Sequence, residues 1–176
     1  MSLSRSMPHT AIVSRAKPES ARFCASTFAA CGLCATSRIT AGRPQIILDV
    51  AHNVEAAQTL ARNLAGSGFA AETIAVCGML RDKDIAGVVR VLAPRITRWH
   101  LASLPGPRAA SAQDLEEILR TAEASTPAEQ FPSPGDALAA ALERAEEGDK
   151  IVVFGSFLTV GEAMSWLKKN NKTSKR

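Results

Sequence analysis

Apolar residues follow two alternating patterns from about residue 45 onwards. Short runs in which most residues are apolar alternate with longer stretches in which apolar residues recur every three or four positions. The short runs predict β-strands buried on both faces, as in a parallel sheet, and the longer stretches predict amphipathic helices. The predicted strands are Gln45–Leu48, Thr73–Val76, Arg98–Ala102 and Lys150–Phe154.

Start and stop signals place helices between these strands. One helix begins at Val54 and ends before Gly66, and the next ends before Pro94. Two later helices open at Ser111 and Ser133, because a serine before a helically spaced segment is typical of an N-cap. The elements therefore alternate regularly along the chain.

This alternation, which closes with a helix over Val160–Leu167, predicts an α/β fold. We expect a Rossmann-like open, mostly parallel sheet with helices on both faces and right-handed crossovers. The chain has 176 residues, of which 46% are hydrophobic, and this is enough for one such domain. We assign residues 43–169 to the domain, 1–42 to a poorly structured basic leader and 170–176 to a basic tail.

Positive charge is concentrated at the two ends of the chain. The net charge is +4, and residues 1–43 contain six basic residues against the single acid Glu19. Such termini are usually solvated, so we expect no nucleic-acid partner. We expect no membrane partner either, because no apolar run approaches ~20 residues. The expected location is cytoplasmic; the alternative is an organelle matrix, because an Arg- and Ser-rich, acid-poor leader also fits a transit peptide.

Polar and charged residues gather directly after the four predicted strands. The carboxyl ends of parallel strands share one edge of a sheet, so these four loops should form a single rim. There an Asp can accept hydrogen bonds from ribose hydroxyls, and a His can contact phosphate or assist a proton transfer. His100 lies inside a strand and is interpreted as structural. The rim candidates are Asp49 and His52, then Asp82 and Lys83, then Arg108, and finally Ser156.

Each candidate also has a structural interpretation. Asp49 and His52 would only cap the following helix, and Asp82 would be an N-cap. Arg108 would lie on a Pro-rich surface turn, and Ser156 would cap the last helix. Taken together, these interpretations leave a charged cluster without a ligand, and we favour a site. The chain contains no G-x-x-x-x-G-K-[ST] sequence, so it lacks the usual cradle for a triphosphate, and no metal ligand is predicted.

At these four loops the chain resembles a known family of ligases. The resembling segments are Leu48–Asn53, Gly78–Asp84, Gly106–Arg108 and Phe154–Val160, in this order and with fitting spacing. They are similar to the C-terminal domain of folylpolyglutamate synthase and of the bifunctional dihydrofolate synthase. More distantly, the chain looks like the third domain of the Mur ligases that build peptidoglycan. The resemblance covers roughly residues 43–167.

The resemblance implies an ATP-dependent, ADP-forming ligase that uses magnesium. Such a ligase phosphorylates a carboxylate of dihydropteroate or of a folate, and L-glutamate then attacks the acyl phosphate. By this analogy Asp49 would hold the ATP ribose, and His52 and Ser156 would act on phosphate and glutamate. Lys83 and Arg108 would offer positive charge to phosphate or to the glutamate carboxylates.

The P-loop domain of that family is missing from this sequence. We therefore expect a truncated, fused or frameshifted product, or an excised domain, that is inactive alone. Two alternatives belong to other classes: a stand-alone module that binds nucleotide or glutamate without chemistry, and a non-catalytic domain whose rim binds a partner protein.

Overall fold

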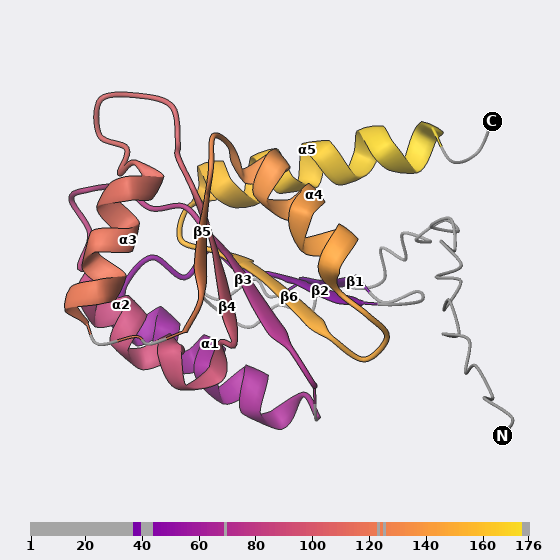
Figure 1. The fold of residues 1–176 in the computed structure, drawn as a ribbon, viewed down its shortest axis with the longest axis horizontal. Helices are drawn as coiled ribbons and strands as arrows, with labels where there is room; N and C mark the ends of the chain where they lie inside the picture. The colour runs from indigo at the N-terminus through magenta and orange to yellow at the C-terminus, as the bar shows by residue number, and fades with distance from the viewer. Residues whose placement is uncertain (1–36, 40–43, 69, 123, 125, 174–176) are drawn as a thin grey trace, which may run out of the picture.

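The computed structural model describes residues 37–39, 44–68, 70–122, 124 and 126–173. They form one six-stranded sheet with the strand order β1-β2-β6-β3-β4-β5 (Figure 1). The first strand is antiparallel to its neighbour, and the other five are parallel. The strands are β1 (Ser37–Ile39), β2 (Gln45–Leu48), β3 (Thr73–Cys77), β4 (Arg98–Ala102), β5 (Ala128–Phe131) and β6 (Lys150–Phe154).

Helices cover both faces of the sheet, as the sequence predicted (Figure 1). One face packs against α1 (Val54–Gly66), α2 (Ile85–Leu92) and α3 (Ala112–Thr121), and a 3-10 turn, η1 (Ala93–Arg95), follows α2. The other face packs against α4 (Pro134–Arg144) and α5 (Phe157–Thr173).

The central strand β6 shows why these strands are almost purely apolar. Val152 and Phe154 belong to the core under α1–α3, whereas Ile151 and Val153 belong to the core under α4 and α5. Successive side chains of a strand point to opposite faces, so a strand covered on both sides must be apolar at every position.

Three features differ from the sequence-based expectation. Strands β1 and β5 were not predicted; β1 lies inside the segment assigned to the leader, and β5 is an edge strand with exposed Glu129 and Gln130. The last helix begins at Phe157 rather than Val160 and continues to Thr173, into the predicted tail. Residues 1–36 of the predicted leader lie outside the described residues.

The topology creates two switch points around β6. The chain leaves β2 and β3 towards the face of α1 and α2, but it leaves β6 towards the opposite face, where α5 lies. In open α/β sheets, crevices that bind ligands form where neighbouring connections diverge in this way. The carboxyl end of β6, with β2 and β3 on either side, is therefore the position at which open α/β sheets bind ligands.

His100 is a core residue, as its position in a strand suggested. Its ring is buried on β4, and Nδ1 donates a hydrogen bond to the Ala137 carbonyl at 3.0 Å. Burial lowers the pKa of His100 below its ordinary value, and the charges of Arg98 and Arg144 act in the same direction. The hydrogen bond to Ala137 and the charge of Glu129 oppose this shift.

We predict that His100 makes the fold sensitive to mild acid. The unfolded chain takes up a proton on this imidazole below pH about 6.5, whereas the folded protein resists it. The free energy of unfolding should therefore be greatest above pH 6.5 and should fall as the pH drops from 7 towards 5. Urea denaturation across that range would measure how steeply the free energy of unfolding changes with pH. His100→Gln should remove part of this pH dependence. An unchanged pH dependence in the variant would assign the effect to other groups.

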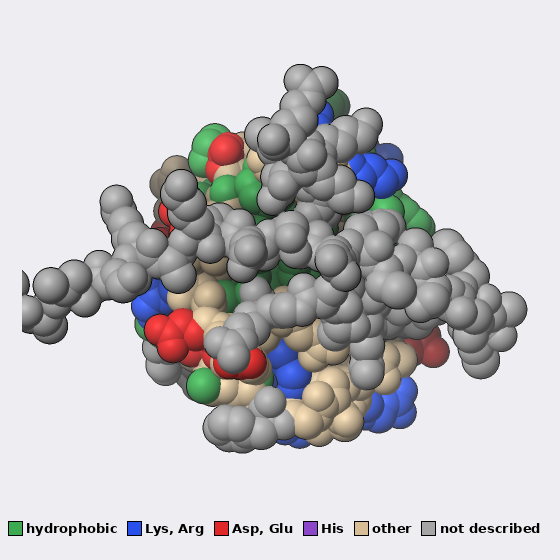
Figure 2. Space-filling model, turned by 90° about the vertical axis from the view of Figure 1, so that its right-hand side faces the viewer, with side chains coloured by type: hydrophobic (Ala, Val, Ile, Leu, Met, Phe, Trp, Pro, Cys, Tyr) green, Lys and Arg blue, Asp and Glu red, His purple; other side chains and the backbone are tan. Residues whose placement is uncertain are grey.

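The described surface carries mixed charge. On the face shown in Figure 2, the visible Lys and Arg side chains are separated by acidic, apolar and uncharged ones. No helix in the described part of the chain is long and apolar enough to cross a membrane.

Candidate functional site

The turn after β2 presents His52 at the rim. The Asp49 carboxylate is fully buried, and its Oδ1 accepts the Ala51 N–H at 2.9 Å, which closes the turn. The N-cap of α1 is Asn53, whose Oδ1 accepts the Ala56 N–H at 2.8 Å. The interpretation of Asp49 and His52 as the cap of this helix is therefore wrong. That role belongs to Asn53, and His52 is left at the surface of the turn.

The hydrogen bond of His52 determines which ring nitrogen faces outward. Nδ1 lies 2.9 Å from the Val50 carbonyl oxygen. A carbonyl can only accept, so Nδ1 carries the proton, and in the neutral ring Nε2 keeps its lone pair. The ring is only partly buried. His52 is thus held in the tautomer that can accept a proton or a hydrogen bond at Nε2.

The loops after β3 and β4 are joined to each other. The Arg81 N–H donates to the Arg108 carbonyl at 2.9 Å, beside an antiparallel bridge between Leu80 and Ala109. Arg108 Nη2 in turn donates to Asp82 Oδ2 at 2.7 Å. Asp82 is therefore the ion-pair partner of Arg108 and does not cap α2.

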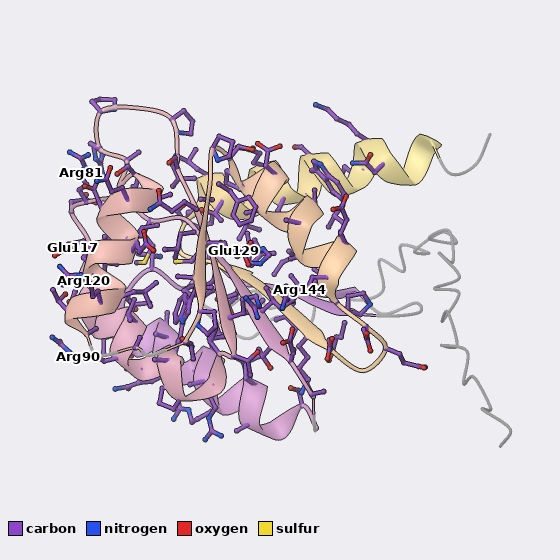
Figure 3. The ribbon with its side chains drawn as sticks, in the orientation of Figure 1. Arg81, Arg90, Glu117, Arg120, Glu129 and Arg144 are labelled. Atoms are coloured by element: carbon purple, nitrogen blue, oxygen red, sulfur yellow. The ribbon has the colours of Figure 1, made fainter. Side chains whose placement is uncertain are left out.

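A second arginine crosses from the β3 loop to the start of α3. Arg81 Nη2 donates to Asp114 Oδ2 at 2.9 Å, close to the first turn of that helix (Figure 3). Hydrogen bonds from Ser111, followed by Arg81, hold the pKa of the Asp114 carboxyl below its usual value. Ser111 is also the N-cap of α3, as predicted. Arg81 is a rim cation that the sequence analysis did not single out.

Lys83 lies in the same loop, immediately before the cap of α2. The cap is Asp84, whose Oδ1 accepts the Gly87 N–H at 2.9 Å. Lys83 is half-buried, and within the described residues its ammonium forms no hydrogen bond or ion pair. Its charge is therefore available to an anion at the rim.

Ser156 is the N-cap of α5, as its structural interpretation proposed. Its Oγ accepts the Thr159 N–H at 3.1 Å and lies 2.8 Å from Thr159 Oγ1. The residue is buried, and both roles of its hydroxyl are used within the helix. A contact between Ser156 and a ligand stays a prediction, as do the roles inferred for the other rim residues.

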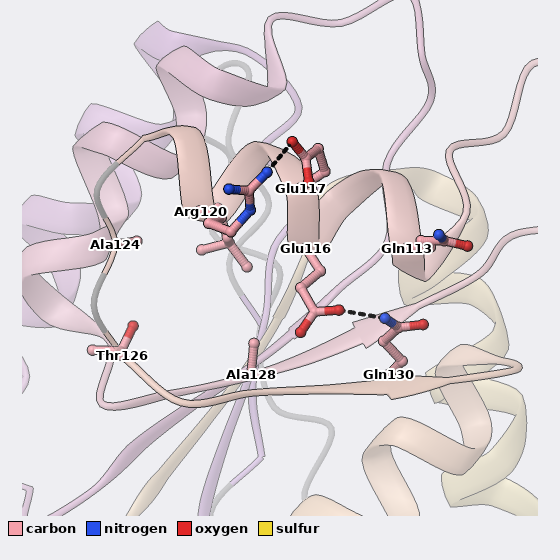
Figure 4. A pocket seen from close by; sticks show the side chains of 9 residues that line it. Gln113, Glu116, Glu117, Arg120, Ala124, Thr126, Ala128 and Gln130 are labelled. Carbon is pink, nitrogen blue, oxygen red and sulfur yellow. Dashed lines mark hydrogen bonds and ion pairs between the residues drawn. The ribbon is translucent and has the colours of Figure 1, made fainter.

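A hollow in the described surface lies away from the rim. Its volume is about 640 Å³, and it opens between α3 and β5 (Figure 4). Glu117 pairs with Arg120 and Gln130 with Glu116 on its walls, and none of the predicted site residues lines it. Among the residues with assigned positions, no group of three or more His, Cys, Asp or Glu side chains could hold a metal ion.

The strand order and the rim of charged loops define an open α/β domain of the Rossmann-like class. Residues 36–157 match the family model described as the Mur ligase, glutamate ligase domain, and the chain belongs to this family. The match begins seven residues before the predicted boundary at residue 43 and includes β1.

Curated relatives identify the branch of the family. The dihydrofolate synthase/folylpolyglutamate synthase of Haemophilus influenzae is 41% identical over 68% of this chain and 28% of its own length. The Escherichia coli protein of the same name is 38% identical over 72% of this chain and 29% of its own length. This chain therefore spans less than a third of these relatives, and what it matches is their C-terminal domain.

Solved structures agree with this assignment. Escherichia coli FolC in complex with DHPP and ADP superimposes with a TM-score of 0.67 at 37% identity, over 72% of this chain and 29% of the other. A bifunctional folylpolyglutamate synthase/dihydrofolate synthase with Mn, AMPPNP and L-glutamate bound gives a TM-score of 0.66 at 41% identity, over 73% and 30%.

Proposed function

We propose that this chain is the C-terminal part of an ADP-forming ligase that adds L-glutamate to dihydropteroate or to a folate. The chemistry would require a second domain that carries the phosphate loop. The observation that carries the proposal is the rim itself: His52, Lys83 and Arg108 follow the parallel strands β2, β3 and β4 at one edge of the sheet, in a domain whose relatives are such ligases.

The rim chemistry suits anionic reactants. Arg108 is held by Asp82 through one nitrogen only, and its side chain remains 69% exposed. Its other N–H groups can bind a carboxylate or a phosphate oxygen. Lys83 adds a second positive charge on the β3–α2 loop, which hydrogen bonds from Arg81 and to Asp82 join to the loop that carries Arg108. The two charges fit the carboxylates of glutamate or the phosphate of an acyl phosphate.

An exposed apolar pair on the rim supports the need for a second domain. Phe157 and Leu158 are 74% and 48% exposed, and they are the large hydrophobic side chains that the described surface leaves open to solvent. They directly follow Ser156 in the first turn of α5. A domain that brought nucleotide to the rim would cover this pair, and its burial would contribute to docking.

The proposed reaction has two steps. A carboxylate oxygen of the pteroate substrate attacks the γ-phosphorus of ATP and expels ADP; the glutamate amine then attacks the acyl carbon and expels phosphate. His52 Nε2 would accept a proton from the attacking amine or contact the phosphate. The second domain would hold Mg²⁺, because the described residues offer no metal set. The buried Asp49 would shape the His52 turn, and its contact with ribose remains a prediction.

Supplying a P-loop domain tests the proposal. We expect the isolated chain to bind ATP only in the millimolar range, about −4 kcal/mol, because most triphosphate contacts are absent. Fused behind the P-loop part of the Haemophilus influenzae relative, in place of that relative's own C-terminal domain, it should release ADP in a glutamate- and pteroate-dependent manner. Fusion avoids the low effective concentration of separate domains.

The outcomes separate the proposal from its alternatives. Glutamate-dependent product, identified by mass, would support the ligase. Micromolar ATP affinity of the isolated chain, measured by calorimetry, would favour a stand-alone binding module. A folded fusion that forms no product would contradict the ligase proposal and favour a partner-binding domain.

A further inference from the structure

Thr159 forms a buried polar link beneath the rim. Its side chain is fully buried in the first turn of α5, and Oγ1 donates to the Gly78 carbonyl at 2.7 Å. A threonine hydroxyl has one proton, so the 2.8 Å contact with Ser156 must be a bond that Ser156 donates and Thr159 accepts. A chain of two hydrogen bonds therefore runs from the Ser156 hydroxyl through the Thr159 hydroxyl to the Gly78 carbonyl.

This link lies where the sheet connections diverge. The hydrogen-bonded ladder between β3 and β6 ends just before Gly78. The Gly78 N–H donates to the Phe154 carbonyl across 3.4 Å, which is long for such a bond. Beyond that point the β3–α2 loop (residues 78–84) and α5 leave towards opposite faces. The Thr159 hydroxyl bridges the two segments at the point where backbone pairing ceases.

The backbone of Gly78 packs tightly against the Thr159 side chain. A Cβ on Gly78 would lie 2.8 Å from Thr159 Oγ1 and 3.0 Å from Leu104 Cδ2. Without the hydroxyl, the buried Gly78 carbonyl would lose its donor and Ser156 its acceptor. Leaving buried polar groups unpaired costs more than the bond itself contributes.

We infer that Thr159 is a positioning residue. Its hydroxyl fixes the position of the β3–α2 loop, which carries Lys83, relative to the start of α5, where Ser156 is the N-cap. The structural half of this inference stands on the contacts alone. The functional half, that the relative position of the loop and the helix start matters for turnover, rests on the proposed function.

Amide hydrogen exchange of the isolated chain tests the structural half. In Thr159→Val, which keeps the shape and removes the hydroxyl, the Arg81 and Lys83 amides should exchange about tenfold faster. The β6 amides should keep their protection. Thr159→Ser should behave like wild type, and Thr121→Val should leave the loop unchanged, because Thr121 caps a carbonyl in α3.

Two results would overturn the inference. Wild-type protection of the loop amides in Thr159→Val would show that the hydroxyl does not hold the loop. Equal loss of protection in Thr159→Val and Thr159→Ser would assign the effect to the packing of the whole side chain rather than to the hydroxyl, because Ser keeps the hydroxyl.

The fusion ligase provides the functional readout. Thr159→Val should raise KM for glutamate or lower kcat by about tenfold, and Thr159→Ser should restore both. Unchanged kinetics in an active Thr159→Val fusion would refute the functional half. If the wild-type fusion is itself inactive, the proposed function fails, while the exchange result still decides the structural half.

Discussion

Gly155→Ala should destabilise this domain by about 3–5 kcal/mol, through backbone strain and overpacking together. Gly155 has φ of +113°, a region that side chains with a Cβ rarely adopt. An added Cβ would lie 2.5 Å from the Gly78 carbonyl oxygen and 2.7 Å from Met79 Cγ. The first of these neighbours is backbone at the end of a central strand, so it cannot move aside cheaply.

Gly106→Ala is the matched control for this prediction. Gly106 has a similar φ of +105°, but nothing lies within 4 Å of its added Cβ. It should cost only the backbone strain, about 1–2 kcal/mol. Guanidinium denaturation of both variants measures the difference. If the two variants lost similar amounts of unfolding free energy, the close approach of the loops after β6 and β3 would contribute little to the loss in Gly155→Ala.

His52→Ala should lower the turnover of the fusion ligase by about a hundredfold or more, the usual contribution of a positioned acid–base group. The fold should lose only about 1 kcal/mol, because the substitution removes a single hydrogen bond, from Nδ1 to the Val50 carbonyl. The initial rate of ADP release and a urea melt measure the two effects separately. An unchanged rate would contradict a role for His52 in the reaction.

Asn53→Ala is the adjacent control. It removes the N-cap of α1, whose Oδ1 accepts the Ala56 N–H, and should cost about 1 kcal/mol of stability. Turnover should stay close to wild type, because the Asn53 side chain accepts its hydrogen bond from the first turn of α1. If the two variants lose turnover equally, the effect of His52 is a general disturbance of the turn.

The central part of the fold could be predicted from sequence because burial on both faces leaves a strong signal. Ile151–Phe154 is apolar at every position, and the structure finds it in the middle of the sheet. The edge strand Ala128–Phe131 was missed because two of its four residues are exposed and charged or polar. An edge strand has one neighbour and less covering, so its sequence need not be apolar.

The candidate site was predictable in its location but not in its hydrogen bonds. Residues that follow parallel strands must share a rim, and this placed His52, Lys83, Arg108 and Ser156 correctly at the carboxyl edge. Which residue caps the helix was not predictable for α1 and α2, whereas the serine caps of the later helices were. Asn53 and Asp84 take the caps that the alternatives gave to other side chains, because neighbouring Asp, Asn and Ser residues are nearly equivalent as caps.

The sequence by itself determined the fold class, the rim and the family, because hydrophobic period and local motifs are properties of neighbouring residues. Only the tertiary structure decided the long-range polar contacts. Arg108 meets Asp82 across 26 positions and Thr159 meets Gly78 across 81, and no local pattern encodes either contact. Both follow from the order of strands in the sheet, which brings together loops that the chain keeps far apart.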